Sequence, residues 1–234
     1  MRKKNKEIIK AVFEIDFDKF QSLYGNNNDV LSLCKGSEEL PYPLHFITIC
    51  WDIIFGYVLE DWKEEYKVIV RKRKAENDKF KSFFAGLGLD MTGIPFSDYW
   101  YAFYCDAPED TVKDCLDMTE DELKEMGFRD MDIELACCVN KFQFDRVEEL
   151  LEQGADPIKN RTDEEDEYDD CVTRIYHEVQ FLYSEMTDKM LGKKGLGHFE
   201  RDLEELLSLA AHERMDHLLD KYYLDKKERY GIYL

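Results

Sequence analysis

One stretch of the sequence decides the fold: Val147-Glu148-Glu149-Leu150-Leu151-Glu152-Gln153-Gly154-Ala155-Asp156-Pro157. Its apolar residues recur at helical spacing. The helix that they predict ends at Gly154, because glycine adopts the left-handed conformation that terminates helices and Pro157 cannot continue one. The same ending occurs earlier, in Phe80-Lys81-Ser82-Phe83-Phe84-Ala85-Gly86-Leu87-Gly88-Leu89-Asp90. Gly88 and Gly154 are 66 residues apart (154 − 88), twice the 33-residue period of one helical repeat. This spacing predicts helix pairs that stack side by side.

Amphipathic helices are predicted along most of the remaining chain. Apolar residues at helical spacing indicate them over residues 8–13, 17–24, 43–56, 57–75, 80–88, 99–104, 108–116, 119–126, 133–140, 144–153, 171–186, 203–211 and 215–223. Thr119 and Glu122 form a capping-box pattern at the start of one of them. The cluster Asn26–Asp29 is typical of a turn. With 5 Pro and 12 Gly in 234 residues, the chain has little turn material for a many-stranded fold, so we predict the all-α class.

The composition indicates a folded and strongly acidic protein. Hydrophobic residues make up 44% of the chain and aromatic residues 14%, which is too much for a disordered chain even with 36% charged residues. The formal net charge is −20, from 52 acidic against 32 basic residues. Such an excess repels nucleic acid and anionic membranes, so we expect neither as a partner. It favours solubility, or a basic protein partner.

The cysteines and the N-terminal residues favour a cytoplasmic protein. The seven cysteines lie mostly within apolar helical patterns and form no C-x-x-C pair: Cys34, Cys50, Cys105, Cys115, Cys137, Cys138 and Cys171. Buried, reduced thiols fit this pattern best. Residues 1–7 are basic, but Lys10, Glu14 and Asp16 interrupt the apolar positions that follow. We therefore expect neither a signal peptide nor a membrane span.

Residues 133–160 resemble an ankyrin repeat. The resemblance rests on a first helix with Leu135, Ala136 and Cys137, then on Val147, Leu150 and Leu151, and on the ending Gly154-Ala155-Asp156. Elsewhere, Pro43-Leu44-His45 is similar to the opening of a repeat, with Tyr42 where threonine is usual, Gly88-Leu89-Asp90 is similar to its ending, and Leu218-Leu219-Asp220 to a last unit. The resemblance implies an irregular α-solenoid of stacked helical hairpins with inserted helices. It also implies that the inner helices and the loop tips bind another macromolecule, and that His45 is a structural residue of a tight turn.

We divide the chain into three predicted segments. Residues 1–162 are expected to form the ankyrin-like helical repeats. Residues 163–198 are expected to be an insertion with an acidic run, one helix and a glycine-rich connector. Residues 199–234 are expected to form a C-terminal helix pair packed on the same stack.

The favoured function is that of a non-enzymatic module that presents a rigid helical-repeat surface to a protein partner. The contact candidates lie at predicted loop tips and in the acidic run: Asp90, Asp156, Asn160, Arg161, Glu164, Glu165, Asp166 and Glu167. No residue is assigned a catalytic role, and we expect no cofactor and no bound metal.

A first alternative treats the acidic charge as functional. Small, acidic, divergent helical-repeat proteins look similar to bacterial immunity proteins that neutralise a secreted toxin. If that toxin is a cationic nuclease, carboxylates of residues 106–125 and 163–170 would occupy its phosphate-binding groove and speed association.

A second alternative is a metal-dependent hydrolase that uses His212, Asp216 and His217. His212 with Asp216, and Glu213 with His217, are each four residues apart, so two ligands would converge on one helix face. The pattern is not H-E-x-x-H, and polar residues on a surface helix explain it better. Arg71-Lys72-Arg73-Lys74, the basic cluster, is likewise interpreted as a solvated helix end.

Overall fold

A computed structural model confirms the predicted all-α class. It describes residues 3–36, 40, 42–61, 64–96, 119–125, 127–156 and 199–230, and these residues form helices and no strand. Over the same ranges, none of the helices combines the length and the apolar character that a membrane crossing requires. The predicted helices over 99–104, 108–116 and 171–186 and the predicted insertion over 163–198 lie outside the described residues.

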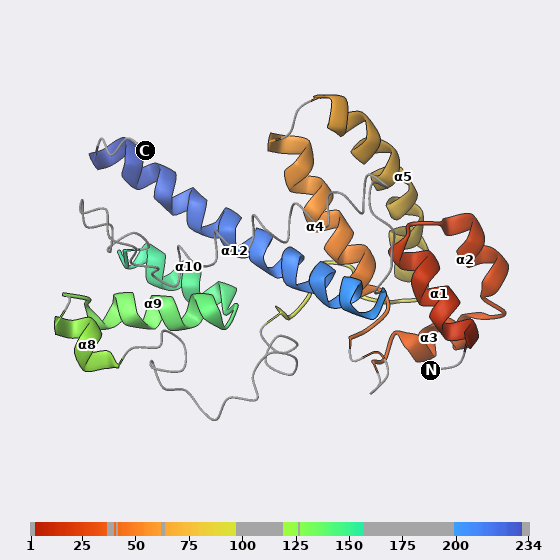
Figure 1. Cartoon of the computed structure of the whole chain (residues 1–234), viewed down its shortest axis with the longest axis horizontal. Coiled ribbons are helices and arrows are strands. Elements are labelled where there is room, and N and C mark those ends of the chain that lie inside the picture. The colour runs from red at the N-terminus through yellow and green to blue at the C-terminus, as the bar shows by residue number, and fades with distance from the viewer. Residues whose placement is uncertain are drawn as a thin grey trace. The chain divides into compact units, whose positions relative to one another are not determined.

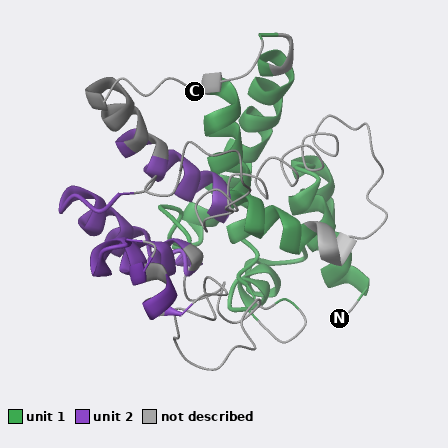
Figure 2. Ribbon diagram, turned by 60° about the vertical axis from the view of Figure 1, so that its left-hand side comes forward, with its two compact units in different colours: residues 1–94, 182–210 green, residues 95–181, 211–234 purple. Residues whose placement is uncertain are grey.

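The chain divides into two compact units, coloured separately in Figure 2. Unit 1 consists of residues 1–94 and 182–210, and unit 2 of residues 95–181 and 211–234. The boundaries of the three predicted segments remain a prediction.

Unit 1 is built from helix pairs. α1 (Lys3–Phe13) and α2 (Phe17–Leu23) form one pair, α3 (Asn27–Leu33) follows, and the longer α4 (Phe46–Asp61) and α5 (Glu64–Gly86) form another, side by side in Figure 1. The predicted pair over 8–13 and 17–24 is confirmed. Aromatic rings join α2 to α5: Phe20 and Phe80 are fully buried with their centroids 5.1 Å apart. Burying such rings contributes roughly 2–3 kcal/mol each.

Unit 2 contains α8 (Glu120–Glu125) and the pair α9 (Asp130–Asn140) and α10 (Phe144–Glu152), which agrees with the predicted helices over 133–140 and 144–153. The Thr119 capping box is confirmed, because the Glu122 carboxylate accepts from the backbone N–H of Thr119 at 2.7 Å and the Thr119 hydroxyl accepts from the N–H of Glu122 at 3.3 Å. Val147 and Leu150 face the core of the unit, with 0% and 1% exposure.

Four predicted helix boundaries are wrong. Residues 203–211 and 215–223 belong to one helix, α12 (Phe199–Tyr230), because the His-Glu-Arg between them contains neither glycine nor proline to end it. The predicted break at Gly56 is also absent, since α4 continues through it to Asp61. The helices predicted over 57–75 and 80–88 are not separated either: their residues form the end of α4 and all of α5. The Asn26–Asp29 turn instead begins α3, where the Asn26 side chain accepts from the N–H of Asp29 at 3.0 Å.

Both glycine helix ends are confirmed. Gly88 and Gly154 have φ of 81° and 92°, in the left-handed region. After α5, Leu89 N donates to Phe84 O at 3.2 Å and Gly88 N to Ala85 O at 2.9 Å. After α10, the corresponding bonds join Ala155 N to Leu150 O and Gly154 N to Leu151 O. Each helix therefore ends in a Schellman motif, which gives partners to carbonyl groups that the helix itself leaves unpaired.

Two bulky residues adopt the same left-handed conformation between paired helices. Ile15, after α1, has φ of 57°, and Phe142, after α9, has φ of 52°. Their hydrogen bonds repeat the Schellman pattern, with Asp16 N bonded to Ala11 O and Gln143 N bonded to Cys138 O. Both side chains are at most 5% exposed. A non-glycine residue in this region is strained by roughly 1–2 kcal/mol, and burial of the apolar side chain offsets that cost.

The C-terminal end of α1 is further capped by side chains from α4 and α5. The indole Nε1 of Trp51 donates to Phe13 O at 3.0 Å, and Nη1 of Arg73 donates to Glu14 O at 2.9 Å. These bonds hold the α1–α2 pair against the α4–α5 pair. Two members of the basic cluster, Arg73 and Lys74, thus have structural roles that the solvated interpretation missed, since Lys74 pairs with Asp52.

The cysteines that the structure describes are free thiols, and Cys34, Cys50 and Cys138 are buried. Burial raises the pKa of Cys34 to about 12, although a hydrogen bond from the backbone of His45 partly opposes this, and burial also raises the pKa of Cys50. These thiols are therefore protonated near neutral pH, as buried structural cysteines are.

A matched pair of variants on α5 tests the capping of α1. We expect Arg73→Met to lower the free energy of unfolding by about 1–2 kcal/mol, because Glu14 O loses a charge-assisted hydrogen bond. Arg71→Met removes the same charge from an exposed position and should change stability by less than about 0.5 kcal/mol. Urea unfolding followed by circular dichroism measures both, and equal effects of the two variants would contradict the capping role.

Candidate functional site

One predicted loop tip follows α10 in unit 2, and its described residues are Gly154, Ala155 and Asp156. Ala155 is buried, with 1% exposure, while Asp156 is half-buried at the edge of the tip. The Schellman motif fixes where the chain leaves the helix. Asp156, a predicted contact residue, therefore starts from a defined backbone position.

The carboxylate of Asp132 in α9 holds this tip in place. Its Oδ1 accepts from the backbone N–H of Asp156 at 2.8 Å, and its Oδ2 accepts from the backbone N–H of Arg129 at 3.2 Å. The Arg129 guanidinium binds both oxygens, at 2.7 Å through Nε and at 2.6 Å through Nη2, and Nη2 also donates to Gly154 O at 2.9 Å. We call Arg129, Asp132 and the Gly154–Asp156 tip the α9 clasp.

The α9 clasp is a buried charge with matched partners. The Asp132 side chain is only 1% exposed, whereas that of Arg129 is 51% exposed. Burial by itself would raise the pKa of Asp132, but the Arg129 guanidinium and the two backbone N–H groups outweigh it and lower that pKa to about 2. The carboxylate is therefore charged at neutral pH, and the clasp stays closed.

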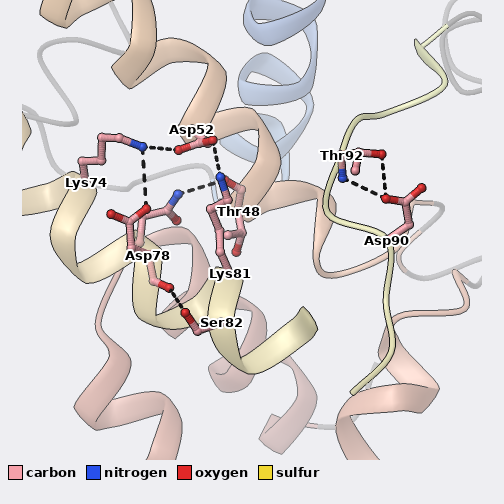
Figure 3. A network of polar contacts seen from close by, with 9 residues as sticks. Thr48, Asp52, Lys74, Asp78, Lys81, Ser82, Asp90 and Thr92 are labelled. Carbon is pink, nitrogen blue, oxygen red and sulfur yellow. Dashed lines mark hydrogen bonds and ion pairs between the residues drawn. The ribbon is translucent and has the colours of Figure 1, made fainter. Parts of the chain in front are cut away.

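The other described contact candidate, Asp90, follows α5 in unit 1. It is exposed, and its Oδ1 accepts from the backbone N–H of Thr92 at 2.9 Å and from the Thr92 hydroxyl at 2.7 Å, as Figure 3 shows. These bonds lower the pKa of Asp90. His45 is buried at the start of α4, and burial lowers the pKa of its imidazole, which the charge of Asp90 partly opposes. This tip is fixed by a local turn rather than by a clasp.

A polar network between α4 and α5 supports the helices that carry Asp90. Lys74 and Lys81 both reach Asp52 of α4, each with a 2.5 Å contact to a different carboxylate oxygen, and Lys74 also lies 3.6 Å from Asp78 (Figure 3). Burial alone would raise the pKa of Asp52, but the two lysines have the larger effect, so the pKa is lowered. In the core nearby, Asn77 is fully buried and donates to Thr48 O at 2.9 Å.

Asp90 and Asp156 occupy equivalent positions, two residues after the left-handed glycine of a helix, but they belong to different units. The other predicted contact residues, Asn160, Arg161, Glu164, Glu165, Asp166 and Glu167, lie outside the described residues. Of the proposed acidic surface over 106–125 and 163–170, only residues from 119 to 125 are described. Their role as contacts remains a prediction.

Exposed carboxylates nevertheless gather on α8, α9 and α10. The exposed acidic residues of the described part of unit 2 up to Asp156 are Asp121, Glu122, Glu125, Asp130, Glu134, Asp145, Glu149 and Glu152. The exposed basic residues over the same ranges are Lys124 and Arg129, and half-buried Arg146 pairs with Glu134 and Glu149. The described surface of these three helices is therefore acidic.

The residues of the hydrolase alternative lie on α12. His212 is 3% exposed and packs edge-on against Phe142, with ring centroids 5.0 Å apart. Glu213 is also buried. Within the described ranges, no three His, Cys, Asp or Glu side chains come together as a set that could hold a metal ion. The interpretation of this segment as a polar surface is wrong for His212 and Glu213, because both are buried.

The α9 clasp was missed in the sequence, although a signal for it exists. Asp132 stands three residues after Arg129, at the position from which an acidic side chain reaches back to the N–H before a helix. The second half of the clasp, the bond to Asp156, joins residues 24 apart and has no local signal.

Substitution of Asp132 tests the clasp. We expect Asp132→Asn to lower the free energy of unfolding by roughly 1–3 kcal/mol, because the amide cannot replace the carboxylate against Arg129 and the two N–H groups. Asp130→Asn is the matched control, since the Asp130 side chain is 88% exposed. Urea unfolding of both variants at neutral pH gives the comparison, and a neutral Asp132→Asn would exclude the clasp as a stabilising contact.

The pH dependence of the same variant gives a second check. The folded pKa of Asp132 is about 2 and the unfolded value is about 3.9, so its stabilisation is complete above about pH 4 and is lost as the pH falls toward about 2. The difference in stability between wild type and Asp132→Asn should therefore shrink over that interval. A difference that stays constant between pH 4 and pH 2 would contradict the lowered pKa.

Comparisons with protein-family models, with curated proteins and with solved structures give no significant match.

Proposed function

We propose that this chain is a non-enzymatic protein-binding module, an irregular α-solenoid of stacked helical hairpins similar to ankyrin repeats. The observation that carries the proposal is the α9 clasp. A buried carboxylate of α9 fixes the backbone at the point where the chain leaves α10, where Gly154 is exposed and Asp156 is half-buried.

A tip held in this way suits binding for a thermodynamic reason. A loop that is already ordered loses little conformational entropy when a partner binds, so more of the contact energy appears as affinity. The resemblance of residues 133–160 to an ankyrin repeat supports the same role, because it implies contacts through loop tips.

The partner that fits this surface best is a basic protein. The exposed carboxylates of α8, α9 and α10 lie in the same unit as the clasp, and the chain carries a net charge of −20. Complementary charge would speed association and make the affinity fall as salt rises. An inhibitor of a basic toxin is one form of this proposal.

Site-specific photo-crosslinking tests the proposal. A photoreactive amino acid in place of Asp156 should crosslink a discrete partner in lysate of the native organism. The control position, Asp18, is exposed on α2 of unit 1, is not one of the carboxylates of α8, α9 and α10, and should not capture that partner. Repeating the reaction at about 50 mM and 500 mM salt measures the electrostatic share, because the Debye length falls from roughly 14 Å to 4 Å.

Three outcomes would argue against parts of the proposal. Equal capture from both positions would exclude the tip as the contact. Capture that is insensitive to salt would exclude the basic partner while leaving the tip as a binding site. Absence of any crosslink from Asp156 would contradict the binding role of the tip.

A further inference from the structure

An apolar patch on α5 lies outside the core that the described residues of unit 1 form. Val68 and Ile69 are the large hydrophobic residues that stand exposed among the described side chains, at 51% and 42%. They are adjacent and lie in the N-terminal half of α5, the helix labelled in Figure 1. Exposing two branched apolar side chains together has a free-energy cost that a partner surface would remove.

The charges on either side of this patch are opposite. Glu64 lies four residues before Val68 and Lys72 four residues after it, so the three side chains form one row along the helix. The side chain of Glu64 is 74% exposed, Lys72 is exposed, and Arg71 beside it is 56% exposed. The Glu64 carboxylate lies 3.4 Å from the Arg71 guanidinium and 3.8 Å from the Lys67 ammonium, but it and Arg71 remain accessible to solvent. From its N-terminal end, the row therefore consists of an acidic residue (Glu64), an apolar residue (Val68) and a basic residue (Lys72).

Such a row is complementary to itself when it is turned around. In an antiparallel crossing of two copies centred on Val68, the residue four positions before the centre meets the residue four positions after it in the other copy. Glu64 of each copy then faces Lys72 of the other, and the two Val68 side chains meet between them. We therefore propose that α5 forms a two-fold symmetric contact with a second copy of this chain. In a two-fold interface each pair occurs twice, so both copies gain the same contacts.

The packing geometry of helices fits this occupant. Residues spaced four apart form one ridge along a helix surface, so Glu64, Val68 and Lys72 can contact a second helix together. Arg73 and Lys74 do not belong to the contact, because both are half-buried and bond Glu14 O and Asp52 inside the unit. This inference is independent of the proposed function.

The contact is expected to be weak. One crossing of two helices is small beside the roughly 1,600 Å² that stable complexes bury, so we expect a monomer–dimer equilibrium with a dissociation constant between about 10 µM and 1 mM. Sedimentation velocity of the purified full chain over this concentration range measures it. A chain that remains monomeric up to about 1 mM would overturn the proposal.

Charge reversal provides the decisive test. Glu64→Lys places lysines opposite each other in the dimer, and Lys72→Glu does the same with glutamates. Each variant should therefore weaken self-association roughly tenfold, since the pair occurs twice and exposed charge pairs are individually weak. An equimolar mixture of the two variants restores both attractive pairs and should dimerise at least as well as the wild type.

The controls separate the interface from general effects of charge. Lys79→Glu reverses a charge on the same helix outside the proposed contact and should leave the dissociation constant within about twofold of wild type. Val68→Asp should abolish dimerisation, and circular dichroism verifies that each variant is folded. Dimerisation that Lys72→Glu and Lys79→Glu weaken equally, or a mixture that fails to associate, would overturn the α5 contact.

Discussion

Helix ends are the constraint on which this structure depends. The last carbonyl groups of a helix have no partner within it, and a chain of short helix pairs has many such ends to satisfy. Here the chain turns left-handed after α1, α5, α9 and α10, at Ile15, Gly88, Phe142 and Gly154. Trp51 bonds the last carbonyl of α1, that of Phe13, and Arg73 bonds the carbonyl of Glu14 immediately after the helix. In this molecule the turns between helices and the side chains packed against them therefore serve the same purpose, which is to bond the carbonyl groups at helix ends.

Charge is used in a similar way at two places in a chain that is acidic overall. Asp132 is buried and pairs with Arg129, and Asp52 is half-buried and pairs with Lys74 and Lys81. A buried carboxylate without such partners would be costly, and a matched one fixes the groups that bind it. The difference lies in what is fixed. Asp52 joins two helices, whereas Asp132 fixes a loop tip.

The sequence predicted those features that short-range patterns determine. The all-α class, the glycine ends at Gly88 and Gly154 and the Thr119 capping box follow from residues a few positions apart. The left-handed residues Ile15 and Phe142 could not be predicted, because isoleucine and phenylalanine rarely adopt that conformation. Here the burial of their side chains offsets the backbone strain. The continuity of α12 was missed because its apolar pattern weakens around His212 without a residue that ends a helix. The tertiary half of the α9 clasp has no sequence signature at all.

The buried thiols have a consequence for how this protein opens. Cys34 and Cys50 lie in unit 1 and Cys138 in unit 2, all shielded from solvent. A thiol reagent can reach such a sulfur only after the surrounding helices separate, so the rate of alkylation reports the frequency of that separation. The chain thus carries natural kinetic probes in both units. Mass spectrometry of the labelled peptides gives the alkylation rate in each unit, without any added dye or engineered residue. Equal rates would indicate that the two units open together, and different rates that they open separately.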